Sequence, residues 1–156
     1  MRESNDSFPT VIHIAIVQET YKKLIPALKL FAQTLQKKEI DFNNIIKIGR
    51  THLQDATPIS LGQEFGAFKS QINHSIQRIE KTLEEIFFLA QGGTAVGTGL
   101  NSSKNFTTAF IKAIQVITKK PFKKSTNHFE SLASHDPIVF FSGGLNTTIT
   151  ACYKIC

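Results

Sequence analysis

The chain has 156 residues, of which 41% are hydrophobic and 19% are charged. This size fits one domain and this composition fits a globular protein, which excludes a disordered tail or a collagen-like repeat. The longest apolar runs, such as residues 138–141, fall far short of the roughly 20 residues of a membrane span, so no membrane is expected. The polar N-terminal residues do not predict a secretory signal. With cysteine only at Cys152 and Cys156, neither a disulfide scaffold nor a metal site is expected.

The formal net charge of +6 raises the question of nucleic-acid binding. Of the 18 basic residues, only Arg2, Arg50 and Arg78 are arginines. Base readout and phosphate clamping depend on the bidentate guanidinium group of arginine. The lysine cluster at residues 119–124 is therefore predicted to be a solvated connection between helices, and no nucleic-acid partner is expected.

A long first helix is predicted from Phe8 onward. Its apolar residues recur at steps of three and four as far as Leu35, which gives the helix a coiled-coil-like apolar seam. Asp6 or Ser7 is the expected N-cap. Pro26 is expected to kink this helix without ending it.

The middle of the chain predicts a short extended segment, a loop and a second long helix. Residues 45–49 are an apolar run typical of extended chain. Residues 50–58 have no apolar period and many hydrogen-bonding side chains, which indicates a loop or a loop with one turn. Apolar residues then recur every three or four positions from Leu61 to about Ala90, which predicts the second helix.

Four glycines lie in residues 92–101 and are expected to end this second helix. A third helix is predicted over residues 105–118, and a fourth begins near Asn127 or Ser131 and runs to the end. The fold class is therefore all-α, an elongated bundle of long helices. Helices of nearly thirty residues would be about 42 Å long, whereas a compact domain of this size has a radius of gyration of about 15 Å. The bundle is thus expected to be incomplete or to be completed by other chains.

His52 is the first candidate for chemistry because it lies in the predicted polar loop. Imidazole can take and give a proton near neutral pH. An ordinary surface or capping role is the alternative for a single loop histidine. The other histidines lie in or near predicted helices, and His135 is not expected to pair with Asp136 because adjacent helical residues do not face each other.

Two further segments are candidates for anion binding. The glycine-rich residues 92–101 could bring backbone N–H groups close to an anion, or could simply reverse the chain between two packed helices. Ser4, Asn5 and Asp6 stand at a helix start, where anions bind readily. N-capping alone would also explain these three residues.

Several segments together resemble one family. GRTHLQDATP at residues 49–58 and LGQE at residues 61–64 resemble the second signature region of class II fumarases, in the aspartase/fumarase superfamily. GGTAVGTGLN at residues 92–101 is similar to the same family almost residue for residue. SND at residues 4–6 resembles its Ser-Ser-Asn-Asp segment, and FESLA at residues 129–133 resembles its Phe-Glu-Ala-Leu-Ala segment. The resemblance implies that residues 1–156 are the central helical-bundle domain of the family's fold, truncated at both ends.

The resemblance also implies an activity, which is the reversible hydration of fumarate to (S)-malate in the tricarboxylic acid cycle, without metal or organic cofactor. Charge develops on the substrate carboxylate when the adjacent proton leaves, and aligned donors must stabilise it. By resemblance, Ser4, Asn5 and Thr51 bind the substrate carboxylates, and His52 is the catalytic proton donor and acceptor. The family is a homotetramer whose active site draws on three subunits. The implied location is the cytoplasm, or the mitochondrial matrix in a eukaryote.

Departures from the family pattern define the alternatives. His52 follows Thr51 where aspartases characteristically carry glutamine, which favours hydration over an aspartase-like ammonia lyase. Glu3 stands where the family has serine and would repel a dianionic substrate if it pointed inward, and His128 stands where lysine is usual. The family's Gly-Ser-Ser loop, with its serine base and following lysine, is absent, so the isolated chain is expected to be inactive. A non-catalytic fragment that assembles with itself or with full-length fumarase is the other alternative.

Overall fold

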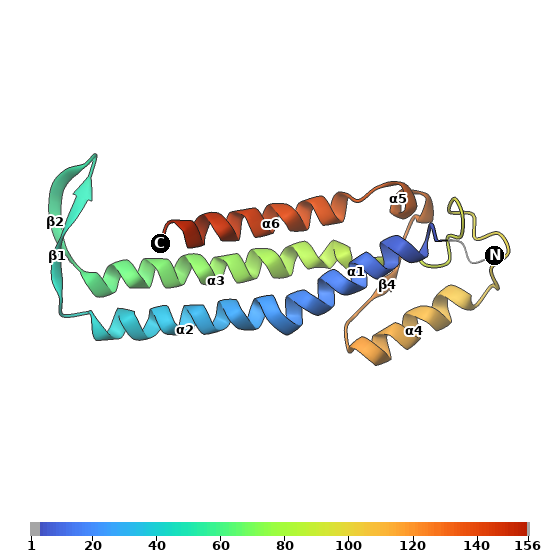
Figure 1. Cartoon of the computed structure of the whole chain (residues 1–156), viewed down its shortest axis with the longest axis horizontal. Coiled ribbons are helices and arrows are strands. Elements are labelled where there is room, and N and C mark those ends of the chain that lie inside the picture. Colours follow the sequence, from blue (N-terminus) through green and yellow to red (C-terminus); the bar gives the residue numbers. More distant parts are fainter. Residues whose placement is uncertain (1–3, 156) are drawn as a thin grey trace. The chain divides into compact units, whose positions relative to one another are not determined.

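The computed structural model describes residues 4–155, and the chain forms two compact units. Figure 1 labels most of their helices and strands. The first unit contains residues 4–22 and 80–143, and the second contains residues 23–79 and 144–155. Helices account for most of the described residues, which confirms the all-α class. The elements, in chain order, are α1 (Ser7–Glu19), the π-helical segment η1 (Thr20–Leu24), α2 (Ile25–Asp41), β1 (Ile46–Thr51), β2 (Gln54–Ser60), α3 (Leu61–Ile86), β3 (Phe88–Leu89), α4 (Phe106–Thr118), β4 (Lys123–Lys124), α5 (His128–Ala133) and α6 (Asp136–Tyr153).

The long first helix is confirmed, with a change of winding in its middle. The helical path runs from α1 through η1 into α2, and Pro26 stands in the first turn of α2. A proline ring clashes with the carbonyl four residues earlier, and that residue, Lys22, belongs to the wider π turn. Pro26 therefore does not end the helical path, as predicted.

The second unit buries the two predicted apolar seams. α2 contributes Leu28 and Leu35, and α3 contributes Ile72 and Ile76, all with 7% or less of their surface exposed. Each pair is spaced by four or seven residues, so its members share one helix face. Lys69 on α3 also forms an ion pair with Glu39 on α2, which brings the end of α2 beside the start of α3.

The segment predicted as a loop at residues 50–58 contains the end of the first strand of a hairpin, its turn and most of its second strand. β1 pairs antiparallel with β2, Ile46 opposite Ser60 and Thr51 opposite Gln54, so extended chain at residues 45–49 is confirmed and the loop was wrong. β2 is exposed over most of its length. A strand with neither face buried lacks the apolar alternation by which a sequence reveals it.

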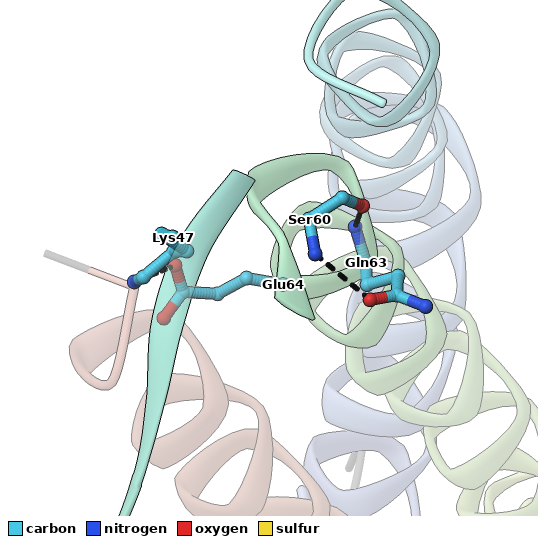
Figure 2. A network of polar contacts seen from close by, with 4 residues as sticks. All are labelled: Lys47, Ser60, Gln63 and Glu64. Atoms are coloured by element: carbon cyan, nitrogen blue, oxygen red, sulfur yellow. Dashed lines mark hydrogen bonds and ion pairs between the residues drawn. The ribbon is translucent and has the colours of Figure 1, made fainter. Parts of the chain in front are cut away.

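A capping box joins the hairpin to α3, as Figure 2 shows. The Ser60 hydroxyl accepts from the Gln63 N–H at 3.0 Å, and the Gln63 side-chain oxygen accepts from the Ser60 N–H at 2.9 Å. This reciprocal pair satisfies two of the free N–H groups of a helix start. Lys47 on β1 donates to Glu64 on α3 at 2.6 Å, which also ties the hairpin to the helix.

The core of the first unit lies where α3 ends. Leu83, Ile86, Leu89 and Phe122 are fully buried. The Phe87 ring meets the Phe122 ring edge-on, with centroids 5.5 Å apart. Aromatic pairs in this geometry add about 0.5–1.5 kcal/mol to the burial of their surface.

Two predicted helix boundaries on either side of this core have different outcomes. α3 ends earlier than the predicted residue 90, because β3 pairs in parallel with β4. The third helix is confirmed as α4, which begins one residue later than predicted and has Asn105 at its N-cap position. Among residues 4–155, no helix is long and apolar enough to cross a membrane.

The predicted last helix is two helices, so a single helix to the chain end was wrong. α5 begins after Asn127, one of the two predicted starts, and the Asn127 side chain accepts from two N–H groups of the first turn. Ser134 is extended, with φ −127° and ψ 148°, and α6 begins at Asp136. Pro137 explains the break, because its ring would clash with the carbonyl of residue 133 in a continuous helix, whereas proline suits a first turn.

Candidate functional site

The turn of the β1–β2 hairpin holds the predicted residues Thr51 and His52, both exposed in the structure. His52 has φ 48° and Leu53 has φ 60°. Two successive left-handed residues form the type I′ hairpin turn, which usually requires asparagine or glycine. Other residues pay roughly 1–2 kcal/mol for this conformation, and Leu53 offsets none of that cost by burial because it is 95% exposed. Strain at an exposed turn marks it as a candidate functional segment.

Ser4 and Asn5 line a cavity of about 350 Å³ in the first unit. Its third polar side chain is His135, and the remaining lining residues are Phe8, Pro9, Ala95 and Leu132. The Asn5 side-chain amide donates to the Ala95 carbonyl at 2.9 Å. This bond uses one of the two N–H donors of the amide and orients the other polar atoms for a ligand. A small cavity with apolar walls and a few polar groups has the make-up of a small-molecule site.

Asp6 ties the start of α1 to the glycine-rich segment. Its Oδ2 atom accepts from the Gly92 N–H at 2.9 Å and from the Thr94 N–H at 3.1 Å, and the residue is only 5% exposed. Asp6 does occupy the predicted N-cap position of α1, but among the described residues its side chain makes no capping bond. The anion that these two N–H groups of the glycine-rich segment hold is the protein's own carboxylate.

The glycine-rich segment also reverses the chain, as the alternative interpretation predicts. Gly92 has φ +99°, and a Cβ atom on it would lie 1.9 Å from the Thr107 hydroxyl. Gly97 has φ +111°, and a Cβ atom there would lie 2.9 Å from the backbone N of Phe129. Both positions combine a left-handed backbone with close approach to a neighbouring element, which only glycine permits.

His128 lies near Asp6 and is electrically neutral near pH 7. Burial lowers the pKa of His128, and the charge of Lys124 lowers it further, against a backbone hydrogen bond to Ala90 and the Asp6 carboxylate. Its Nδ1 atom is buried and has no hydrogen-bond partner among the described residues. His128 therefore adds no permanent positive charge to the surroundings of Asp6.

His13 on α1 is buried and held in one tautomer. Its Nδ1 atom lies 3.0 Å from the Ile86 carbonyl oxygen and 2.9 Å from the Phe88 carbonyl oxygen, so Nδ1 carries the proton that it donates. Burial lowers the pKa of His13, the two carbonyl bonds oppose this shift, and the charge of His135 adds to it. His13 is therefore neutral near pH 7, within electrostatic reach of the pocket residue His135.

The predicted site residues fall into two groups. Ser4 and Asn5 share the pocket of the first unit, whereas Thr51 and His52 share the hairpin turn of the second unit. Glu3 lies outside the described residues. Sequence reasoning missed the pocket position of His135. It considered that histidine as a partner for Asp136 and as part of a segment resembling the family, but not as a site residue.

The bond between Asp6 and the glycine-rich segment was also missed. It joins Asp6 to Gly92, which are 86 positions apart, and no local sequence pattern predicts a contact over that separation. Within residues 4–155, no three His, Cys, Asp or Glu side chains gather as metal ligands. Cys156 lies outside those residues.

Comparison with known proteins places these features in context. A family model described as lyase matches residues 2–156. "Fumarate hydratase class II" of Rickettsia bellii is 54% identical over 99% of this chain and 33% of its own length. The mitochondrial fumarate hydratase of Rhizopus oryzae is 52% identical over 99% of the chain and 31% of its own length. The crystal structure of class II fumarase from Schistosoma mansoni superposes with a TM-score of 0.84 at 41% identity, covering 96% of this chain and 34% of that one. The chain thus spans about a third of the length of the relatives it matches.

Proposed function

Because the chain belongs to the lyase family and resembles class II fumarases over nearly its whole length, we propose that it acts as part of a class II fumarate hydratase. Such an enzyme adds water reversibly to fumarate to give (S)-malate, a step of the tricarboxylic acid cycle. The observation that carries this proposal is 54% identity, over 99% of the chain, to a protein named for that activity. We take residues 1–156 as the central helical domain of a longer subunit, located in the cytoplasm or the mitochondrial matrix.

In this proposal His52 is the proton donor and acceptor for the added water. Its imidazole is exposed at a strained turn, where a substrate can reach it. Imidazole suits this task because it exchanges protons near neutral pH. Thr51, the preceding residue in the same hairpin, offers its hydroxyl to a substrate carboxylate.

Ser4 and Asn5 are the proposed carboxylate donors of the pocket. The Asn5 amide is already oriented by its bond to the Ala95 carbonyl, so little conformational freedom is lost when a carboxylate binds to its second N–H. Donors fixed in advance also stabilise the charge that develops when the neighbouring proton leaves. The pocket volume of about 350 Å³ is ample for a four-carbon dicarboxylate.

The hairpin turn and the pocket are proposed to act together in a homotetramer. The family's active site draws on three subunits, and here the candidate residues divide between two compact units. We therefore expect the hairpin turn of one copy to complete the pocket of another. Leu53, exposed at the same turn, supports this role because a large apolar side chain at such a tip gains free energy when a partner covers it.

A chimeric enzyme tests the proposed function. Residues 2–156 replace the matching third of the Rickettsia bellii relative, and fumarate formed from malate is followed by its absorbance. The chimera should turn over malate, and His52→Asn should lower kcat by roughly 10²–10⁴-fold, the usual contribution of general acid–base catalysis. His74→Asn, at an exposed histidine of α3, is the matched control and should leave kcat unchanged.

Three outcomes would contradict parts of this assignment. Full activity of the His52→Asn chimera would remove His52 from the chemistry. Turnover of aspartate in place of malate would instead identify an ammonia lyase, and a folded, tetrameric chimera without either activity would favour the role of a non-catalytic assembly fragment.

A further inference from the structure

We propose that His135 is a substrate-binding residue of the pocket, where its imidazolium receives one of the two carboxylates of the dicarboxylate. The inference rests on the proposed function and adds a residue to it. Its basis is the position of His135 in the wall of the same cavity as Ser4 and Asn5.

The pocket lining combines neutral hydrogen-bond donors with one ionisable side chain. Ser4 and Asn5 supply neutral donors, and the remaining lining residues apart from His135 are apolar. Ser4, Asn5 and His135 are all exposed, so a dicarboxylate in this open pocket loses part of its hydration, and neutral donors do not fully offset that loss. Among the described residues of the lining, His135 is the one that can carry a positive charge. A charged donor binds carboxylate about twice as strongly as a neutral one.

The other described ionisable groups around the pocket supply no positive charge to it. The Asp6 carboxylate is buried and accepts hydrogen bonds from two N–H groups of the glycine-rich segment. These bonds offset part of its negative charge, so its repulsion of a bound anion is reduced. His13 and His128 are both neutral near pH 7, since burial lowers the pKa of each. Asp136 follows His135 in the chain but begins α6 and is not part of the pocket lining. Of the described ionisable groups around the pocket, His135 is therefore the one placed in its lining to offer a positive charge to a dianion.

Neutral His13 also has a consequence for His135. A charged His13 would repel a charged His135, because the two histidines interact electrostatically. The two carbonyl bonds at Nδ1 and the burial of the ring hold His13 in its neutral tautomer. Neutral His13 therefore places no positive charge beside His135 when the anion binds.

A binding experiment on the 156-residue chain tests this role. Fumarate is titrated into isotope-labelled protein, and the amide signals of Asn5 and Ala95 report occupancy of the pocket. His135→Gln should weaken fumarate binding about tenfold or more, the loss expected for a hydrogen bond to a charged group. His135→Lys, which restores a positive donor, should bind within about threefold of wild type. His74→Gln, an exposed histidine of the other unit, should leave the affinity unchanged.

Crotonate, in which a methyl group replaces one carboxylate of fumarate, separates a binding role from a structural one. Wild-type protein should prefer fumarate to crotonate, and His135→Gln should remove most of that preference. Fumarate affinity that is unchanged in His135→Gln but weakened in Asn5→Ala overturns the inference and leaves the proposed function intact. A wild-type chain that binds no fumarate also overturns the inference, whereas the proposed function is judged separately by turnover of the chimera.

Discussion

Replacement of Asp6 by alanine is the most demanding test of how the pocket is built. The change removes the acceptor of the Gly92 and Thr94 N–H groups, which lie 2.9 and 3.1 Å from Oδ2. A hydrogen bond to a charged group contributes about 1.5–3 kcal/mol. The Gly92 bond is buried, so its donor is left without water, whereas the Thr94 bond is only partly buried and its donor can rehydrate. We therefore expect Asp6→Ala to lower the free energy of unfolding by about 3 kcal/mol.

Urea unfolding measures this loss, and amide hydrogen exchange locates it. Exchange at Gly92 and Thr94 should accelerate in Asp6→Ala. Asp6→Asn keeps an acceptor without the charge and should cost about half as much. Asp55→Ala is the matched control, because Asp55 pairs with Arg50 at an exposed site and such pairs contribute about 0–1 kcal/mol. An Asp6→Ala protein within about 0.5 kcal/mol of wild type, with unchanged exchange, would refute this account of the glycine-rich segment.

Three further predictions concern single positions. Gly92→Ala should lower the free energy of unfolding by about 2 kcal/mol or more, since φ is +99° and the new Cβ atom would clash with a threonine side chain. Gly143→Ala, with no atom within 4 Å of the new Cβ, should instead stabilise its helix by about 0.5–1 kcal/mol. Urea unfolding of the two variants measures both changes. Ser60→Ala opens the capping box with Gln63 and should cost about 1 kcal/mol, with faster amide exchange in the first turn of α3. Burial lowers the pKa of His13 below its ordinary value of 6.5, so the unfolded state takes up the proton first and stability is lost as pH falls below about 6.5. The free energy of unfolding should therefore drop between about pH 7 and pH 5 in wild type and drop less in His13→Gln, and equal slopes would contradict the burial argument.

The helices could be predicted because their information is local. Leu28 and Leu35 in α2 and Ile72 and Ile76 in α3 repeat at the helical period, and the structure buries all four. The break before α6 was missed although its cause is also local, since Pro137 stands one residue after the helix start. The sequence around that proline is apolar, and for this reason a single continuous helix was predicted.

The hairpin could not be predicted from periodicity. A half-buried strand shows alternating apolar and polar residues, but β2 is exposed along most of its length and so carries no such record. Its turn gives no help either, because His52 and Leu53 adopt a conformation that the sequence normally signals with asparagine or glycine. The chemistry proposed for His52 rests on a family resemblance, whereas its left-handed backbone is known only from the structure.

For the pocket, the sequence indicated the right segments but not that they lie together. Residues 4–6 and residues 92–101 were two separate candidates, each with a purely structural alternative. The structure joins them through the bonds of Asp6 to Gly92 and Thr94 and the bond of Asn5 to Ala95. The structural interpretation therefore holds for the glycine-rich segment, and the same segment orients the Asn5 amide, whose role in substrate binding stays a prediction.

This arrangement implies that the two groups of proposed site residues are positioned independently. Asn5 depends on Asp6 and the glycine-rich segment, whereas His52 depends on the hairpin and its capping box at Ser60. These supports lie in different compact units and share no residue. Asp6→Ala should therefore leave amide exchange in the hairpin unchanged, and Ser60→Ala should leave it unchanged at Gly92. Exchange that accelerates in both places after either substitution would mean that the units unfold together and that the pocket has no stability of its own.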